Sequence, residues 1–193
     1  PEAVINMLAF LGWNPGTEQE IFSLDGLVAA FELDRVHKAG AKFDPEKTKW
    51  FQHQYLQGID DTILASQFSE VLNEKGITTS LDVTKIVSLV KERATFLSDL
   101  WGQSNFFFIT PENYNEKASL KAFKPETPEI LKAVIEILSS AEDFSEANIS
   151  EKVKSWVVSK ELGFGKVMMP LRLALVGEMK GPDVFDIAAV LGK

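Results

Sequence analysis

The chain has 193 residues, and 45% of them are hydrophobic, which is enough to bury the core of one or two compact domains. It has no cysteine and two histidines, which excludes a disulfide framework and thiolate zinc sites and leaves little for any other metal site. No apolar run reaches about 18 residues and no signal peptide pattern is present, so we exclude membrane and secreted classes and expect a cytoplasmic protein. Because Pro1 cannot be a translational start, we interpret the chain as a fragment.

The net charge of -8 counts against a protein that coats nucleic acid, because phosphate binding usually leaves a basic surface. The charges are unevenly distributed, however. Residues 145–193 carry seven Lys or Arg and six Asp or Glu, a net charge of +1, whereas residues 1–144 carry -9. If any part of the chain contacts phosphate, the final third is the better candidate.

Helical patterns follow one another from the N-terminus. Residues 1–11 are almost wholly apolar, and after a turn Ser23 is a good N-cap for a second helix. That helix has apolar residues at i, i+3, i+4 and i+7, which predicts one buried stripe made of Leu24, Leu27, Val28 and Phe31. Asp44 followed by Pro45 predicts a third helix, because Asp caps free N–H groups and Pro suits the first helical position.

Two more stripes follow in the middle of the chain. Apolar residues from Leu64 to Leu72 predict a helix that ends near Gly76, and those from Val83 to Leu97 predict a longer one. Between Trp101 and Pro128 the periodicity fails, and we expect a linker or domain boundary there. Phe106, Phe107 and Phe108 in this stretch could stack on bases, but without interleaved Lys or Arg a role in core packing is favoured.

The last part of the chain continues the helical pattern. Thr127 and Pro128 predict the start of one helix, and residues 149–157 carry the stripe of the next. Pro170 interrupts the following pattern, which we expect to resume and continue to Gly177, and the last helix is predicted to run from Pro182 to Gly192. No strand alternation persists, so the sequence predicts an all-α fold.

No arrangement of residues predicts catalysis or metal binding. Adjacent Asp60 and Asp61 do not face each other on a helix, so helix capping is favoured over acid/base chemistry. His37 and His53 have no Ser, Cys or paired His at a recognised spacing, which favours surface or packing roles. We therefore predict no catalytic residue and no metal site in this chain.

Arg93 and Arg172 differ from the other charged residues because each lies beside an apolar stripe. One explanation is a side chain whose aliphatic stem covers apolar surface while its charge stays in water. The other is a guanidinium group presented to a base edge or a phosphate. The sequence pattern alone leaves both explanations open.

Several segments resemble bacterial-type glutamyl-tRNA synthetases, in the order in which that family carries them. The segments PEAVINMLAFLGW, EIFSL, FELDRV and KFDPEKTKWFQHQYL resemble the region that follows the catalytic domain. The segment KERATFL around Arg93 fits the same family, and KVMMPLRLALVG with GPDVFDIAAVLGK resembles its C-terminal end. The combination is specific, whereas either end alone would be weaker.

The resemblance implies the all-α, C-terminal part of a glutamate-tRNA ligase, an aminoacyl-tRNA synthetase that uses ATP and magnesium. The two ATP-binding signatures of the family are absent, so we expect this chain alone to be inactive and to hold no cofactor. Residues 1–56 would end the stem-contact region, and residues 57–125 and 126–193 would form two anticodon-binding subdomains. The expected partner is tRNA(Glu), bound by a monomer, with no role for DNA or a membrane.

The anticodon contacts of the family carry over to five positions of this chain. Arg93 would help to read the third anticodon base from the first subdomain, and Arg172, Gly181, Pro182 and Val184 would form one anticodon-loop surface in the second. The alternative is a helical protein-interaction module without nucleic-acid binding, which the acidic charge favours. A free-standing hydrolase or transferase is the weakest interpretation, because no nucleophile is paired with a base.

Overall fold

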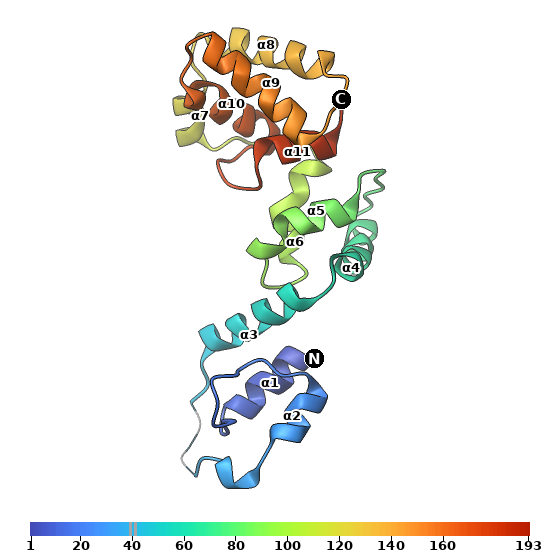
Figure 1. Cartoon of the computed structure of the whole chain (residues 1–193), viewed down its shortest axis with the longest axis vertical. Coiled ribbons are helices and arrows are strands. Elements are labelled where there is room, and N and C mark those ends of the chain that lie inside the picture. The colour runs from blue at the N-terminus through green and yellow to red at the C-terminus, as the bar shows by residue number, and fades with distance from the viewer. Residues whose placement is uncertain (39, 41) are drawn as a thin grey trace.

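A computed structural model describes residues 1–38, 40 and 42–193. Three groups of helices follow one another along the long axis of the molecule, with the N-terminus in the first group and the C-terminus in the third (Figure 1). Across the described ranges, the only β pairing is an isolated bridge between Trp13 and Val36. The predicted all-α fold is therefore confirmed.

In the first group α1 packs against α3, and the core beside them contains the aromatic residues Trp13 and Phe22 (Figure 1). Its elements are α1 (Glu2–Phe10), α2 (Leu24–Ala30), the 3₁₀ helix η1 (Leu33–Arg35) and α3 (Pro45–Gly58). Ser23 and Asp44 cap α2 and α3 as predicted, by accepting hydrogen bonds from backbone N–H groups. The predicted buried stripe on α2 is wrong, because Leu27 alone is buried and Val28 is 72% exposed. A helix of two turns that packs on α1 covers only one of its apolar residues.

The second group is built around the contact of α4 with α5. Its elements are α4 (Asp61–Glu74), α5 (Val83–Val90), the 3₁₀ helix η2 (Lys91–Arg93), α6 (Asp99–Ser104) and the 3₁₀ helix η3 (Asn105–Phe107). The stripe from Leu64 to Leu72 is confirmed, with Leu64, Phe68 and Leu72 buried. Gly76 takes a positive φ of 72° just beyond α4, as a helix-ending glycine does.

The predicted helix from Val83 to Leu97 is wrong beyond Val90, where the chain turns. The carboxylate of Asp99 accepts hydrogen bonds from the N–H groups of Thr95 and Phe96, which holds the turn from one side. From the other side, Gln57 of α3 donates to the Lys91 carbonyl. These tertiary hydrogen bonds replace the next turn of the helix while the apolar side chains of the stripe remain in the core.

The third group is a helical bundle whose core is shared by four helices. Its elements are α7 (Glu116–Ala122), α8 (Thr127–Ser140), α9 (Glu146–Ser159), α10 (Phe164–Val176) and α11 (Val184–Leu191). Pro170 lies inside α10 without ending it, contrary to the expected interruption, and α10 ends at Gly177 as predicted. The last helix begins at Val184 rather than at Pro182, because the Asp183 side chain caps it by accepting from Phe185 N–H.

The stretch from Trp101 to Pro128, predicted to be a linker or domain boundary, is not a linker, since α6, η3 and α7 lie there, and the domain boundary stays a prediction. These elements are too short to show a periodic stripe, and their packing depends on residues far away in the sequence. Phe106 and Phe107 are buried with Ile86 of α5 and Ile187 of α11, which confirms a core role for this cluster and joins the second group to the third.

The helix α7 packs on α10 through Ala118 and Ala122, which contact Leu173. The expected subdomain boundaries after residues 56 and 125 stay predictions. The first falls inside α3, and the second falls between α7 and α8. If contacts are used to divide the chain, α7 goes with the third group.

Candidate nucleic-acid interface

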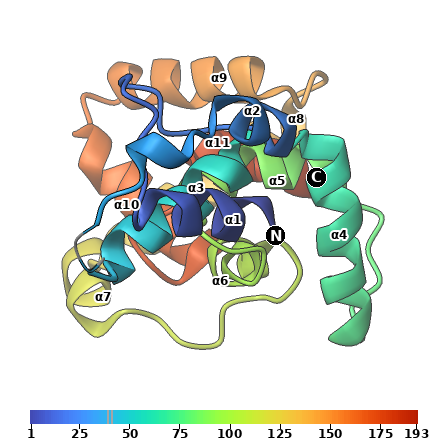
Figure 2. The same cartoon turned by 90° about the horizontal axis from the view of Figure 1, so that it is seen from below.

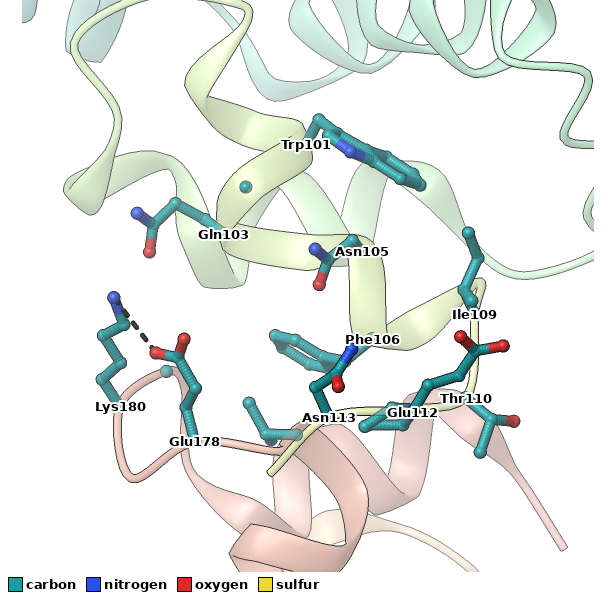
Figure 3. A pocket seen from close by; sticks show the side chains of 14 residues that line it. Trp101, Gln103, Asn105, Phe106, Ile109, Thr110, Glu112, Asn113, Glu178 and Lys180 are labelled. Atoms are coloured by element: carbon teal, nitrogen blue, oxygen red, sulfur yellow. Dashed lines mark ion pairs between the residues drawn. The ribbon is translucent and has the colours of Figure 1, made fainter. Parts of the chain in front are cut away.

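A cavity of about 340 Å³ lies where the second and third helical groups meet (Figure 3). One wall is formed by α6 and η3, a second by the loop of residues 109–113, and a third by the end of α10 and the loop of residues 176–181. This size is at the small end of the range for pockets that bind small organic ligands, roughly 300–1,000 Å³. It can admit a single planar group rather than a helix.

The walls of the cavity combine aromatic faces with amide side chains. Trp101 and Phe106 contribute the aromatic rings, and Gln103, Asn105 and Asn113 contribute the amides (Figure 3). Each amide offers both hydrogen-bond donors and acceptors, as the edge of a nucleobase also does. Chemically, this combination suits a flat ring with polar groups on its rim.

Trp101 is held in place by Phe108 and Lys75. Its indole stacks on Phe108 with 6.3 Å between the ring centroids and 14° between the planes. The ammonium group of Lys75 lies 4.9 Å from the centroid of the same indole, a cation–π distance. The ring is therefore oriented before any ligand enters.

The floor of the cavity is built around Gly181, which has a φ of +125°, a value that L side chains rarely adopt. A Cβ atom at this glycine would lie 3.7 Å from Nη1 of Arg172 and 4.0 Å from Cζ of Phe106. The backbone therefore brings the guanidinium group close to the cavity wall. A larger residue here would be strained by the positive φ, while its Cβ would make ordinary contacts with both side chains.

Nη1 of Arg172 is buried and has no hydrogen-bond partner within the part of the chain that the structure describes. A buried N–H donor without a partner costs about 1–3 kcal/mol, and more for a charged group. A ligand acceptor that reaches this nitrogen would recover that cost. Arg172 is not among the residues that line the cavity, so an acceptor in the cavity can pair with this nitrogen only after the side chains around it rearrange.

Two carboxylates decide which part of a nucleotide the cavity can accept. Glu112 and Glu178 both line it, and the lysine beside them, Lys180, is paired with Glu178 at 3.1 Å (Figure 3). A phosphate group would be repelled by these charges, whereas a neutral base would not. The electrostatics favour an uncharged ring.

The five residues expected from the sequence do not all lie together. Arg172 and Gly181 are adjacent, and Pro182 follows as a buried residue. Val184 is 3% exposed and packs in the core of the third group, so its side chain faces away from solvent. Arg93 lies on η2 with its side chain exposed and donates to the Leu89 carbonyl, and it does not line the cavity.

The other residues considered in the sequence have structural contacts. Asp60 caps α4, and its hydrogen bonds from the Thr62 hydroxyl and backbone N–H lower the pKa of the carboxyl group. His37 and His53 each make one hydrogen bond, to the Asn14 side chain and the Ala94 carbonyl. Over residues 1–38, 40 and 42–193, no three His, Cys, Asp or Glu side chains form a metal-binding cluster. The same residues contain no helix long and apolar enough to cross a membrane.

Sequence reasoning missed most of the cavity wall. Trp101, Gln103, Asn105 and Asn113 lie in the stretch that had been assigned to a linker. A signal was present, because residues 101–111 combine aromatic and amide side chains and contain no charged residue. That composition is unusual for a solvated linker and could have identified a binding surface.

The chain is similar over its whole length to known proteins. It is 58% identical to the glutamate-tRNA ligase of Flavobacterium johnsoniae and 57% identical to that of Flavobacterium psychrophilum, and it spans 38% of the length of each. The crystal structure of a glutamate tRNA ligase from Elizabethkingia meningosepticum in complex with its amino acid matches all of this chain, and the chain covers 38% of it, with a TM-score of 0.95 and 48% identity.

A second crystal structure, of a glutamate-tRNA synthetase from Elizabethkingia anophelis, matches with a TM-score of 0.91 and 46% identity over all of this chain and 38% of the other. These findings confirm the resemblance that the sequence segments carry. The family model described as an anticodon binding domain matches residues 53–193, which include all of the second and third helical groups. The chain therefore belongs to the anticodon binding domain family.

Proposed function

We propose that this chain binds the anticodon loop of tRNA(Glu) and reads its bases, as the anticodon-binding part of a glutamate-tRNA ligase. The observation that supports this most directly is the cavity between the second and third groups, with aromatic walls, three amides and the unpaired Nη1 of Arg172 nearby. Bases of a single-stranded loop can leave their stack and present polar edges to such a site. The match to the family model described as an anticodon binding domain supports this function over the alternative of a protein-interaction module.

In this proposal one anticodon base enters the cavity, and the rest of the anticodon loop contacts the third helical group. Trp101 stacks on the ring, the amides contact its edge, and Arg172 donates to an acceptor on it. Gly181 and Pro182 form the backbone surface beside Arg172. Val184 belongs to the same surface through its backbone only, because its side chain is buried.

In this proposal the chain only binds tRNA, and the chemical reaction is carried out by another part of a longer ligase. We propose that its catalytic domain uses ATP and magnesium to join glutamate to tRNA(Glu), and that it acts as a monomer in the cytoplasm. The residues described here do not fit a magnesium site, because they hold no cluster of carboxylates or histidines that could bind the ion. Residues 1–56 would contact the tRNA stem, and residues 57–125 and 126–193 would be the two anticodon-binding subdomains.

The proposal is tested by the binding of the chain to two tRNA transcripts that differ only in the anticodon. We expect tighter binding of the glutamate anticodon, and Arg172→Ala should weaken that complex by about 1–3 kcal/mol while changing the mismatched one little. Lys152→Ala, an exposed residue of α9, is the control and should behave as wild type. Equal affinity of the wild-type chain for both transcripts would contradict anticodon reading.

Arg93 allows a second, separate test, because it lies outside the cavity on the exposed surface of η2. We propose that it reads the third anticodon base, by which glutamate and glutamine anticodons differ. Arg93→Gln should then reduce the preference for the glutamate anticodon over the glutamine one by about tenfold, equivalent to about 1.4 kcal/mol. An unchanged ratio of the two affinities would remove Arg93 from the recognition surface.

A further inference from the structure

Three lysines form an exposed line along α7. Lys117 and Lys121 are four residues apart on the helix, and Lys124 follows two residues after its end, which gives the spacing i, i+4, i+7. Lys117 and Lys121 therefore share one face of α7, about 5–6 Å apart at Cβ, whereas Lys124 lies beyond the extended C-cap residue Phe123. None of the three forms an ion pair with any carboxylate of the described residues. We refer to them as the lysine line.

Such a line is unfavourable unless something neutralises it. Like charges four residues apart destabilise a helix by about 0.2–0.5 kcal/mol per pair. The chain as a whole carries a net charge of -8, so abundant carboxylates were available to pair with these lysines. The ammonium group of Lys124 donates to the Leu120 carbonyl and keeps two further donors, so the three exposed cations together suit a polyanionic ligand.

Within the lysine line, Lys117 is nearest in sequence to the cavity residue Asn113, and Lys121 and Lys124 lie farther along the chain. Asn113 lines the cavity, and the N–H of Asn115, the N-cap of α7, donates to the carbonyl of Gly177 at the end of α10. From there α7 runs antiparallel to α10, with Ala118 and Ala122 packed on it. Figure 2 shows the loop after α6 leading to α7, which lies against α10.

The far end of the line reaches a second groove. Lys121 and Lys124 line it from one side, and Lys166, in the first turn of α10, lines it from the other. The carboxylate of Glu126 lies 3.7 Å from Lys166 and is the only acidic residue in the lining. With three lysines and one glutamate, the lining of this groove has a net charge of +2.

We propose that the lysine line binds successive phosphates of the RNA strand that leaves the base held in the cavity. The inference rests on the proposed function, which supplies that base. The cavity accepts a ring and repels phosphate, so the phosphates that flank the base must lie outside it, and the line provides cations there. Lys117 and Lys121 lie one turn apart on α7 and Lys124 follows the end of the helix, so successive cations can meet a backbone with one charge per nucleotide.

The triple variant Lys117→Gln, Lys121→Gln and Lys124→Gln tests whether the lysine line binds phosphates. Glutamine has nearly the helix propensity of lysine, so α7 should stay folded, which circular dichroism checks. Each phosphate contact on a single strand contributes about 0.7 to the slope of log affinity against log salt concentration, so the slope should fall by about 2. Both transcripts should weaken by the same factor, because phosphates carry no sequence.

The matched control is the triple variant Lys132→Gln, Lys152→Gln and Lys160→Gln, which removes the same charge from exposed positions of α8 and α9. Its salt slope should equal that of the wild-type chain. If the slope of log affinity against log salt concentration is equal for the two triple variants, the lysine line does not bind the RNA phosphates and the proposal is wrong. A wild-type chain that does not distinguish the two anticodons would instead contradict the proposed function and leave the slope comparison as a measure of non-specific binding.

Discussion

Gly102→Trp is expected to abolish the preference of the chain for the glutamate anticodon. Gly102 lies in α6 and lines the cavity, and a Cβ atom built on it meets no other atom within 4 Å. An indole at this position can therefore occupy the space proposed for a base without straining the helix. The expected cost is the sum of one stacking contact, about 1–3 kcal/mol, and one edge contact, about 1–3 kcal/mol.

The matched control is Gly58→Trp. Gly58 is also a helical glycine with nothing within 4 Å of its Cβ position, but it lies at the end of α3 and does not line the cavity. Filter binding with the two transcripts should show full discrimination for Gly58→Trp and none for Gly102→Trp. If Gly102→Trp still prefers the glutamate anticodon, the base does not bind in this cavity.

The fold was predictable where the residues that begin, bury and end a helix all lie within or next to that helix in the sequence. For α4, the sequence contains an acidic cap at Asp60, a stripe that ends at Leu72 and a glycine beyond it, and the structure has all three. For α5, the stripe continues past the helix, because Ala94 stays buried after the backbone has turned. Apolar spacing reports which side chains are buried, and it does not report hydrogen bonds to distant residues such as Gln57.

The site was less predictable than the fold, since its walls come from three separate segments. Arg172 and Gly181 were expected only through resemblance to a family, and the structure places them side by side, with the Cβ position of Gly181 3.7 Å from Nη1 of Arg172. The amides of Gln103, Asn105 and Asn113 have no characteristic spacing, because loops and short helices set their positions. Only the packing of the second group on the third brings them to the same cavity.

That packing depends on one small cluster, and Ile187→Ala should disrupt it. Ile187 of α11 is fully buried against Ile86 of α5 and the rings of Phe106 and Phe107. Truncating a buried isoleucine to alanine typically destabilises a protein by about 2–5 kcal/mol. Phe106 also forms part of the cavity wall, so we expect a loss of anticodon discrimination in addition to the loss of stability.

Ile149→Ala separates these two effects. Ile149 of α9 is equally buried, but it packs in the core of the third group and not against the second. Denaturant unfolding should show similar destabilisation of both variants, whereas transcript binding, measured where both are folded, should lose discrimination only in Ile187→Ala. If both variants discriminate equally well, the cavity does not need the cluster between α5, η3 and α11 to hold its shape. Selective loss in Ile187→Ala would show that anticodon reading requires the second and third groups to be fixed relative to each other.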